Sequence, residues 1–382
     1  MIKIIHLISG LGIGGAEKQL SQLVALSNPA EFKHIVVSMQ DLGKMGPNLV
    51  EKNIVLYTLN MKRGRISLLG ILKLIKILFK ERPYILQTWL YHADLLGLLV
   101  GKLLRTPKII WNVRCSNMDV KYYSKLTALV VKLCCWFSSF PTAIIVNSKA
   151  GEALHKNTLG YKAKHWEWIP NGFQIDYYKP DLHARKLFRK ELALTDENAL
   201  LGMVARWDPM KDPFTFLRTA KELIQKFPKA RFVFVGHGMD SANLELNTEI
   251  KRLGLEKFVY ILGVQQNIPR ILNALDLLVL PSAFGEGFPN ILGEAMACGV
   301  LCVATNVGDA ALIIEETGKI VEHSNVSQLS EALEAMLVLD PGSRRELQTL
   351  ARQKIINTFE SSTIVKKYET FYRTLLGIKE ST

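Results

Sequence analysis

Several residue patterns are missing from this sequence, and each absence narrows the class of protein. Its five cysteines form no Cys-x-x-Cys pair, which argues against a disulfide framework and a zinc site. No apolar run approaches the roughly 20 residues of a membrane span, because Pro141 interrupts the uncharged window at 133–148. The apolar run of the N-terminal stretch MIKIIHLISGLGIGG is too short for a signal peptide, so we interpret it as a first strand. We expect a cytoplasmic protein with reduced thiols.

Acidic residues are scarce in the first part of the chain. Residues 1–170 contain 23 Lys and Arg but only 9 Asp and Glu, a balance of +14, whereas the remaining 212 residues carry 25 against 26. This asymmetry indicates an acidic partner for the first half: nucleic acid, an anionic membrane or a phosphorylated substrate. The sequence has no basic motif interleaved with aromatic residues of the RNP type, so we expect no nucleic-acid partner.

What is present is an alternation of short β-branched runs with helical patterns over 382 residues, enough for two domains. We expect strands at 2–8, 34–38, 55–59, 85–88, 109–113, 143–146, 200–204, 232–235, 259–262, 277–280 and 301–304. Strands that alternate with helices predict an α/β fold built from parallel sheets. Turn-forming residues at 169–187 mark the domain boundary. Two such sheets would form a cleft at the carboxyl ends of their strands, where ligands bind.

A glycine-rich loop follows the first strand. Gly10-Leu-Gly12-Ile-Gly14-Gly15 satisfies G-x-G-x-x-G, a pattern that lets backbone N–H groups approach a phosphate or a sugar closely. A dinucleotide site would also need an acid after the second strand, and Asp41 fits that position only loosely. The alternative is a tight turn that packs a helix on the sheet.

Two further motifs carry charged residues in the second half. Arg206 and Lys211 follow the first strand there and can converge on one diphosphate. Glu286 lies on a glycine-rich loop and Glu294 in the helix after it, positions from which carboxylates can accept bonds from sugar hydroxyls. Solvated surface charge is the alternative for each.

Taken together, these motifs resemble the retaining GT-B glycosyltransferases of family 4 (group 1). The resemblance rests on Gly14-Gly15-Ala16-Glu17, Ile169-Pro-Asn171-Gly172, Arg206 with Lys211, Gly236-His-Gly238, Glu286-x₇-Glu294 and Val307-Gly308-Asp309. It implies two Rossmann-like, doubly wound parallel-sheet domains facing across a cleft. Residues 1–170 would bind the acceptor and residues 171–361 the nucleotide sugar, with a C-terminal helix at 362–377 packing back on the first domain.

The resemblance also implies roles for individual residues. Arg206 and Lys211 would stabilise the departing nucleotide diphosphate, Glu286 would bind the transferred sugar and Glu294 the ribose. The rest of the nucleotide-sugar site would consist of Gly14, Gly15, Gly236, Val264, Gly287, Phe288, Pro289 and Asn290. Such enzymes need no cofactor besides the nucleotide sugar and no metal, and the sequence has no Asp-x-Asp pair to hold Mg²⁺.

The sequence departs from the family pattern after the fourth strand, where many members have a histidine that contacts the donor sugar. Trp89 takes that position here and His92 lies three residues later, so either His92 substitutes in catalysis or it is structural. Arg114, at the end of the fifth strand, is a candidate for an acceptor phosphate, with surface charge as the alternative. We assign Trp89 and Arg114 to acceptor binding.

A basic stripe suggests where the acceptor resides. Lys73, Lys76 and Lys80 lie on one face of the helix expected at 67–81, which suits an anionic membrane surface as well as an ordinary solvated face. The charge balance of the first half favours a peripheral position on the inner face of the cell membrane and a glycolipid or polyprenyl-diphosphate-linked acceptor. A soluble acceptor is the alternative. An NAD-dependent oxidoreductase is a weaker one, because it leaves Arg206 and Lys211 without a role.

Overall fold

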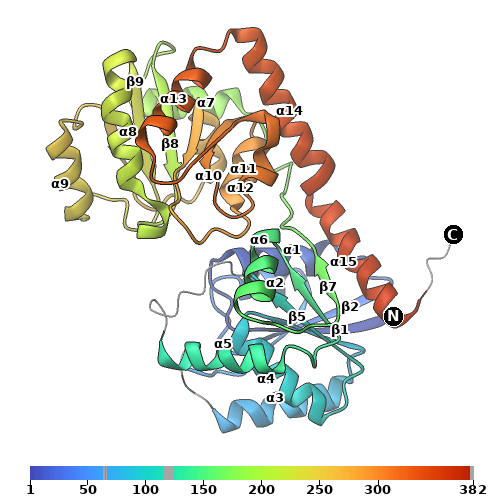
Figure 1. Ribbon diagram of the computed structural model, residues 1–382. Helices are drawn as coiled ribbons and strands as arrows, with labels where there is room; N and C mark the ends of the chain where they lie inside the picture. The colour runs from blue at the N-terminus through green and yellow to red at the C-terminus, as the bar shows by residue number, and fades with distance from the viewer. Residues whose placement is uncertain (63–64, 66, 115–123, 379–382) are drawn as a thin grey trace. The chain divides into compact units, whose positions relative to one another are not determined.

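The computed structural model describes residues 1–62, 65, 67–114 and 124–378, and the chain forms two compact units. Unit 1 comprises Met1–Gly172 and Ser361–Thr382, and unit 2 comprises Phe173–Glu360. The chain thus passes into unit 2 close to the boundary expected after residue 170 and returns to unit 1 for its last helix (Figure 1). Each unit is an α/β unit around an all-parallel sheet, which confirms the predicted fold class.

Unit 1 contains a seven-stranded sheet in the order β3-β2-β1-β4-β5-β6-β7. Its strands are β1 (Ile2–Ile8), β2 (Phe32–Ser38), β3 (Val55–Thr58), β4 (Ile85–Trp89), β5 (Lys108–Val113), β6 (Ala143–Val146) and β7 (Trp166–Trp168). Its helices are α1 (Gly15–Leu26), α2 (Gly46–Glu51), α3 (Leu68–Glu81), α4 (Tyr91–Leu103), α5 (Lys125–Phe137), α6 (Lys149–Ala153), which continues into a π-helical turn (Leu154–Thr158), and α15 (Ser361–Leu376).

Helices cover both faces of this sheet, and β1 shows how its residues are divided between them. Ile4 and Ile8 pack with α1 and α15, whereas Ile5 and Leu7 pack with α3 and α4. Side chains of a strand alternate between faces, so an unbroken apolar strand serves two helical layers. The helix α5 covers the same face as α4, next to it.

Unit 2 contains a six-stranded sheet in the order β10-β9-β8-β11-β12-β13. Its strands are β8 (Ala199–Val204), β9 (Ala230–Val235), β10 (Val259–Ile261), β11 (Leu277–Leu280), β12 (Leu301–Thr305) and β13 (Lys319–Val321). Its helices are α7 (Leu182–Glu191), α8 (Pro213–Lys226), α9 (Leu244–Leu253), α10 (Ile268–Ala274), α11 (Asn290–Ala297), α12 (Ala310–Ile314), α13 (Val326–Leu337) and α14 (Pro341–Phe359), with 3₁₀ turns at Pro209–Lys211 and Glu315–Thr317.

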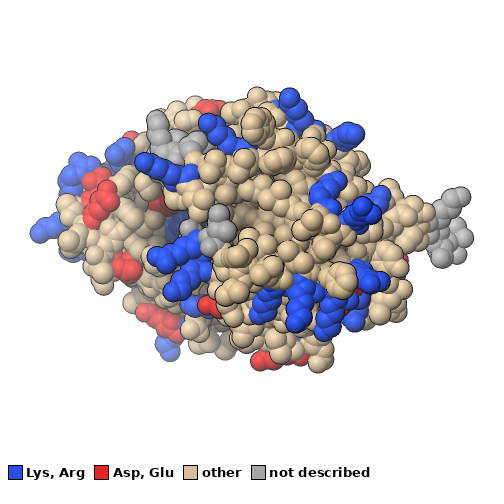
Figure 2. Space-filling view, turned by 90° about the horizontal axis from the view of Figure 1, so that it is seen from below, with Lys and Arg blue, Asp and Glu red and all other residues tan. Residues whose placement is uncertain are grey.

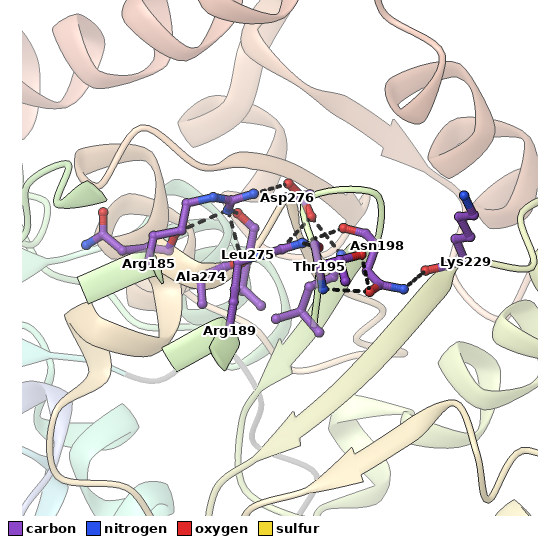
Figure 3. A network of polar contacts seen from close by, with 10 residues as sticks. Arg185, Arg189, Thr195, Asn198, Lys229, Ala274, Leu275 and Asp276 are labelled. Atoms are coloured by element: carbon purple, nitrogen blue, oxygen red, sulfur yellow. Dashed lines mark hydrogen bonds and ion pairs between the residues drawn. The ribbon is translucent and has the colours of Figure 1, made fainter. Parts of the chain in front are cut away.

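A buried ionic network ties α7 to this sheet (Figure 3). Arg185 and Arg189 of α7 reach the two oxygens of the Asp276 carboxylate, at 2.7 and 3.1 Å. Arg189 also donates to the carbonyls of Thr195 and Asn198. Asp276 accepts a hydrogen bond from the backbone N–H of Leu200, the second residue of β8. The network fixes the start of β8, and so the strand that leads into Arg206 and Lys211.

The eleven predicted strands are all present, with bounds that differ by at most two residues. The prediction missed β7 and β13, which have three residues each and lie at sheet edges. The sequence also predicts a helix over residues 120–139, and α5 occupies Lys125–Phe137, whereas residues 120–123 lie outside the described part of the chain. None of the helices in the described part is both long and apolar enough to cross a membrane. Figure 2 shows a face on which Lys and Arg outnumber Asp and Glu.

Candidate active site

The loop after β8 carries the two predicted cations of unit 2. Asp208 shapes it, because its carboxylate accepts from the Met210 backbone N–H at 3.0 Å and from Arg206 Nε at 2.7 Å. Burial raises the pKa of Asp208, but these two bonds and the charges of Arg206 and Lys211 outweigh burial and hold it below its usual value. The Arg206 side chain is 59% exposed. Arg206 is therefore restrained at its Nε and accessible to a ligand.

Lys211 and Glu286 form an ion pair between the loop after β8 and the loop after β11. Their side chains are only 14% and 8% exposed, so little solvent screens the pair. Ser282 donates its hydroxyl to the same carboxylate oxygen at 2.6 Å. The structure thus brings together two predicted site residues, and it adds Ser282, which sequence reasoning missed.

The loop that carries Glu286 is held by the strand next to β11. Thr305, the last residue of β12, donates its hydroxyl to the Ser282 carbonyl at 2.6 Å, and the Asp309 N–H donates to the Gly287 carbonyl at 2.8 Å. Gly308 has φ +64°, and a Cβ there would lie 2.4 Å from the Glu286 carbonyl oxygen. The Val-Gly-Asp motif therefore allows two backbones to approach so closely that a side chain would separate them.

A second close approach joins the loops after β8 and β9. Gly236 has φ +143°, and a Cβ there would lie 1.9 Å from the Ala205 carbonyl oxygen. The Gly236 N–H donates to the carbonyl of Gly263, which follows β10. Val264, the next residue, is 68% exposed. The predicted nucleotide-binding residues thus lie at the carboxyl ends of neighbouring strands, where parallel α/β sheets bind ligands.

The segment Gly287, Phe288, Pro289 and Asn290 leads from the Glu286 loop into α11. The Phe288 ring is 6% exposed and packs against Phe173 and Phe359. Its side chain belongs to the core, so a contact between this residue and a nucleotide sugar would come from the backbone. The N-terminal end of α11 at Asn290 carries the partial positive charge of a helix start, which favours a phosphate.

Glu294 lies inside α11 and is 8% exposed. It interacts with Tyr178: burial first, then the charge of Glu294 and a hydrogen bond to it, raise the pKa of the Tyr178 hydroxyl. Sequence reasoning missed Tyr178, because it lies in a turn-rich segment without a recognisable motif. A ribose that binds Glu294 would share this carboxylate with Tyr178.

The glycine loop of unit 1 begins α1. Gly14 is the N-cap and Gly15 the first helical residue. A Cβ at Gly14 would lie 2.4 Å from Glu17 Oε2, so the carboxylate of Glu17 folds back over the loop. An acid in the first turn stabilises the helix start. The Glu17 carboxylate lies where the glycine-loop hypothesis would place a phosphate or a sugar. Because it is negatively charged, it favours a sugar hydroxyl at this position over a phosphate.

Trp89 is a core residue of unit 1. It is 0% exposed, and its indole Nε1 donates to His6 Nδ1 at 3.3 Å. This placement contradicts the predicted contact between Trp89 and an acceptor, because the side chain has no exposed surface. The side chains of His6, Arg114 and Tyr368 enclose the ring, and the residues of the strand alone did not reveal this packing.

Arg114 lies 4.7 Å from the centroid of the Trp89 ring, so the two predicted acceptor residues are in contact. Its guanidinium donates to the Asn112 side chain at 3.0 Å, to the Asn171 side chain and to the Tyr368 hydroxyl at 2.6 Å. These bonds hold Asn171 and α15 on the sheet of unit 1. A role in acceptor binding stays a prediction beside this structural role.

The Pro-Asn-Gly motif at 170–172 has a structural explanation. The Gln19 side chain bonds both the N–H and the carbonyl of Gly172, at 3.0 and 2.9 Å. A Cβ at Gly172 would lie 2.8 Å from the Ser361 Cα. The motif therefore fastens the point at which the chain leaves unit 1 to the point at which it returns.

His92 lies in the first turn of α4 and is half-buried. The residue before this helix, Leu90, has φ +73°, a conformation that is strained for leucine. The sharp turn from β4 into α4 brings His92 to the carboxyl end of the sheet. The catalytic role of His92 stays a prediction.

The chain was compared with known proteins. Residues 13–177 match the family model described as Glycosyltransferase Family 4, and residues 198–338 match the one described as Glycosyl transferases group 1. The UDP-Gal:alpha-D-GlcNAc-diphosphoundecaprenol alpha-1,3-galactosyltransferase of Escherichia coli is 28% identical over 311 residues, which is 79% of this chain and 78% of the relative. The capsular polysaccharide biosynthesis glycosyltransferase CapM of Staphylococcus aureus is 26% identical over 339 residues, or 86% and 87%.

Among solved structures, Alr3699/HepE of Anabaena, crystallised in complex with UDP, superposes with a TM-score of 0.83 at 22% identity. The superposition covers 98% of this chain and 100% of that one. The two parallel sheets, the family models and these relatives agree, and they exclude the oxidoreductase alternative. The chain belongs to the group 1, family 4-type glycosyltransferases and has the GT-B fold.

Proposed function

We propose that this enzyme moves a sugar from a UDP-sugar to a hydroxyl of a membrane-associated glycolipid or polyprenyl-diphosphate-linked saccharide, in the synthesis of a surface polysaccharide or lipopolysaccharide. The E. coli relative is named for a UDP-Gal donor and a diphosphoundecaprenol-linked acceptor, and the S. aureus relative for capsular polysaccharide. The observation that carries the proposal is the buried Lys211–Glu286 pair beside the accessible Arg206 at the strand ends of unit 2.

The proposed reaction retains the configuration of the anomeric carbon. The bond between that carbon and the diphosphate breaks, while the acceptor oxygen forms a new bond to it on the same face. The proton of the acceptor hydroxyl passes to the departing phosphate oxygen. Arg206 and Lys211 stabilise the negative charge that grows on this oxygen, Glu286 binds the transferred sugar, and Glu294 binds the ribose.

In this proposal, protein cations do the electrostatic work that Mg²⁺ does in other nucleotide-sugar enzymes, and no cofactor takes part. Lys211 already lies against Glu286, so a bound diphosphate and the carboxylate would share its ammonium group. Arg206 contacts Asp208 through Nε, so its two terminal nitrogens can bind the diphosphate while that contact is kept. Arg206 is therefore the cation that meets the diphosphate first, and Lys211 the one that completes its neutralisation.

The basic first half supports a peripheral position on the inner face of the cell membrane. Lys73, Lys76 and Lys80 of α3 are all exposed. Each lysine near an anionic leaflet contributes about 1 kcal/mol of attraction. A membrane-embedded acceptor would then be reached without a membrane-spanning helix.

The test is a transfer assay with a panel of nucleotide sugars, undecaprenyl-diphosphate-linked saccharides and free saccharides, in the presence and absence of EDTA. We expect transfer from a UDP-sugar to a lipid-linked acceptor, undiminished by EDTA, with an α-linked product by NMR. Exclusive transfer to free saccharides would instead support the soluble-acceptor alternative. Loss of transfer with EDTA would contradict metal independence, and an inverted product would contradict retention.

A further inference from the structure

The helices α3, α4 and α5 form one layer on a face of the unit 1 sheet, and their outward side is unusually apolar. We define the outer helical face by six large side chains: Leu69, Leu72 and Phe79 of α3, Leu103 of α4, and Leu129 and Trp136 of α5. Their exposed fractions are 80%, 52%, 64%, 68%, 52% and 81%. Single exposed leucines are ordinary, but a run of large apolar side chains across three adjacent helices is typical of an interaction site.

Folding of unit 1 does not require these side chains. Each of the three helices has a separate inward stripe that fills the core, such as Leu74 and Leu78 in α3 or Val130 and Cys134 in α5. The outward residues recur at helical spacing on the opposite side, as Leu129 and Trp136 do two turns apart. Both sides of these helices are apolar, and among the described residues only the inward side belongs to a hydrophobic core.

Positive charge is interspersed with the apolar groups. Lys73, Lys76, Lys80, Lys102, Lys125 and Lys132 are exposed on the same three helices. The two acidic residues of these helices, Glu81 and Asp94, are not exposed on this face. Glu81 accepts hydrogen bonds from Lys3 and Tyr57, and Asp94 is fully buried. All three helices lie within the described residues, and none carries an exposed carboxylate. Figure 2 views the molecule from the side on which these helices lie in Figure 1 and shows separate blue groups on a broad tan surface.

We infer that the outer helical face inserts shallowly into an anionic lipid bilayer, with Trp136 as its main anchor. The inference deepens the proposed membrane acceptor, on which it rests, by adding an apolar contribution to electrostatic attraction. Lysine stems can lie along the apolar surface while their ammonium groups reach lipid phosphates. Tryptophan favours the boundary between headgroups and acyl chains, because its ring is apolar and its N–H is polar.

The combination of groups favours a bilayer over a protein partner. A protein interface centre is depleted of lysine, whereas here each of the three helices carries exposed lysine as well as exposed large apolar side chains. The face also extends over three helices instead of forming a single groove for one partner helix. A fluid, anionic surface matches such a mixed pattern.

The test uses co-sedimentation with vesicles of phosphatidylcholine alone and of phosphatidylcholine with phosphatidylglycerol, at low and at molar salt. We expect wild-type protein to bind the anionic vesicles and to retain part of this binding at molar salt. Trp136→Ser should lower the partition coefficient about tenfold or more, since burying one such side chain contributes about 1.5–3 kcal/mol. Trp136→Phe should keep most of the binding. Leu244→Ser, at a residue of unit 2 that is 79% exposed, is the matched control and should bind as wild type.

A fluorescence readout locates the anchor. Trp136 is the most exposed of the six tryptophans, all of which are described. Brominated lipids should therefore quench wild-type fluorescence and quench Trp136→Phe much less at equal binding. Hydrolysis of a UDP-sugar by water should be the same in wild type and Trp136→Ser, because Trp136 lies outside the candidate active site.

Three outcomes would overturn the inference. The first is binding that molar salt abolishes and Trp136→Ser leaves unchanged, which means purely electrostatic adhesion. The second is absence of vesicle binding, and the third is a wild-type dimer in solution that Trp136→Ser converts to monomers. None of them contradicts the glycosyltransferase reaction. Conversely, salt-resistant vesicle binding together with transfer only to soluble saccharides would contradict the proposed lipid-linked acceptor. It would still support the outer helical face as a membrane-binding surface.

Discussion

At the scale of single residues, the candidate active site of unit 2 depends on a buried charge pair. Lys211 and Glu286 come from loops far apart in the sequence, and only the folded sheet brings them together. Their residue types and their positions after strands were visible in the sequence. Their direct contact, and the hydroxyl of Ser282 on the same carboxylate, were not, because they depend on how neighbouring strand ends are spaced.

Replacing Lys211 with alanine should lower the turnover number about 100-fold or more, since loss of one preorganised charge at a developing anion has this effect. The proposed diphosphate would lose a cation, and the buried Glu286 would lose its partner. Initial-rate kinetics with a fixed lipid-linked acceptor would measure the effect. Lys229→Ala is the matched control, because Lys229 is 63% exposed and forms an ion pair with Glu197, itself 71% exposed. Equal turnover in Lys211→Ala and wild type would refute the catalytic role of Lys211.

Arg189 provides a test of stability apart from catalysis. It is 3% exposed and donates to Asp276 and to three backbone carbonyls. Arg189→Ala should lower the free energy of unfolding by about 3 kcal/mol, because three backbone carbonyls lose a charged donor, although Asp276 keeps its bonds from Arg185 and the Leu200 N–H. Urea denaturation would measure the loss. Arg252→Ala, at a residue that is 61% exposed and pairs with Glu249, should change stability by less than about 1 kcal/mol; similar losses in both variants would contradict the network's importance.

At the scale of elements, periodicity predicted the central strands well, because an unbroken apolar run of β-branched residues is distinctive. The edge strands β7 and β13 were missed for a physical reason. Each has only three residues and is packed less completely than the central strands, so neither shows a strong pattern. Trp89 illustrates the converse: its position after the fourth strand suggested a ligand contact, but packing of α15 and β1 around it decided its burial.

The pairing of β1 with β2 predicts a pH effect on stability. His6 and His34 lie on these strands with their ring nitrogens 2.8 Å apart, and both are buried. Burial lowers the pKa of His34 to about 4 from an ordinary value of 6.5, and burial with the nearby His34 lowers the pKa of His6 as well. The unfolded chain therefore binds these protons more readily, so stability should fall as the pH drops from about 6.5 towards 4.

The expected loss for His34 alone is on the order of 3 kcal/mol across this range. Urea denaturation at several pH values would measure it. Burial acts in the opposite direction on Asp94, whose pKa it raises, so the slope must be compared with a variant. His34→Gln should flatten the pH dependence between 6.5 and 4; an unchanged slope would show that other groups cause it.

At the scale of the whole molecule, the order of the chain connects the two units twice. The last helix, α15, belongs to unit 1 although the residues before it belong to unit 2. The sequence predicted this return through its family resemblance, since an amphipathic helix by itself does not reveal which sheet it covers. The buried side chains of α15 now identify its partner: they share a core with β1, β4 and α1.

Removal of residues 361–382 should therefore unfold unit 1 and leave unit 2 largely intact. Ile364, Val365, Tyr368, Phe371 and Tyr372 are each at most 6% exposed. At about 1.5–3 kcal/mol for each buried side chain, their loss approaches the 5–15 kcal/mol that stabilises a typical domain. The Tyr368 hydroxyl bond to Arg114 and the Ser27 bond to Glu369 would be lost with them.

Limited proteolysis with mass spectrometry would locate the effect of this truncation. We expect rapid cleavage within residues 1–172 and protection of 173–360, with partial protection restored by adding a peptide of residues 361–378 in trans. Glu369→Gln in the full chain is the mild control, because it keeps the helix and an acceptor for Ser27 and should leave the digestion pattern unchanged. Equal protection of both units in the truncated chain would show that the strand and helix contacts of residues 1–172 suffice without α15.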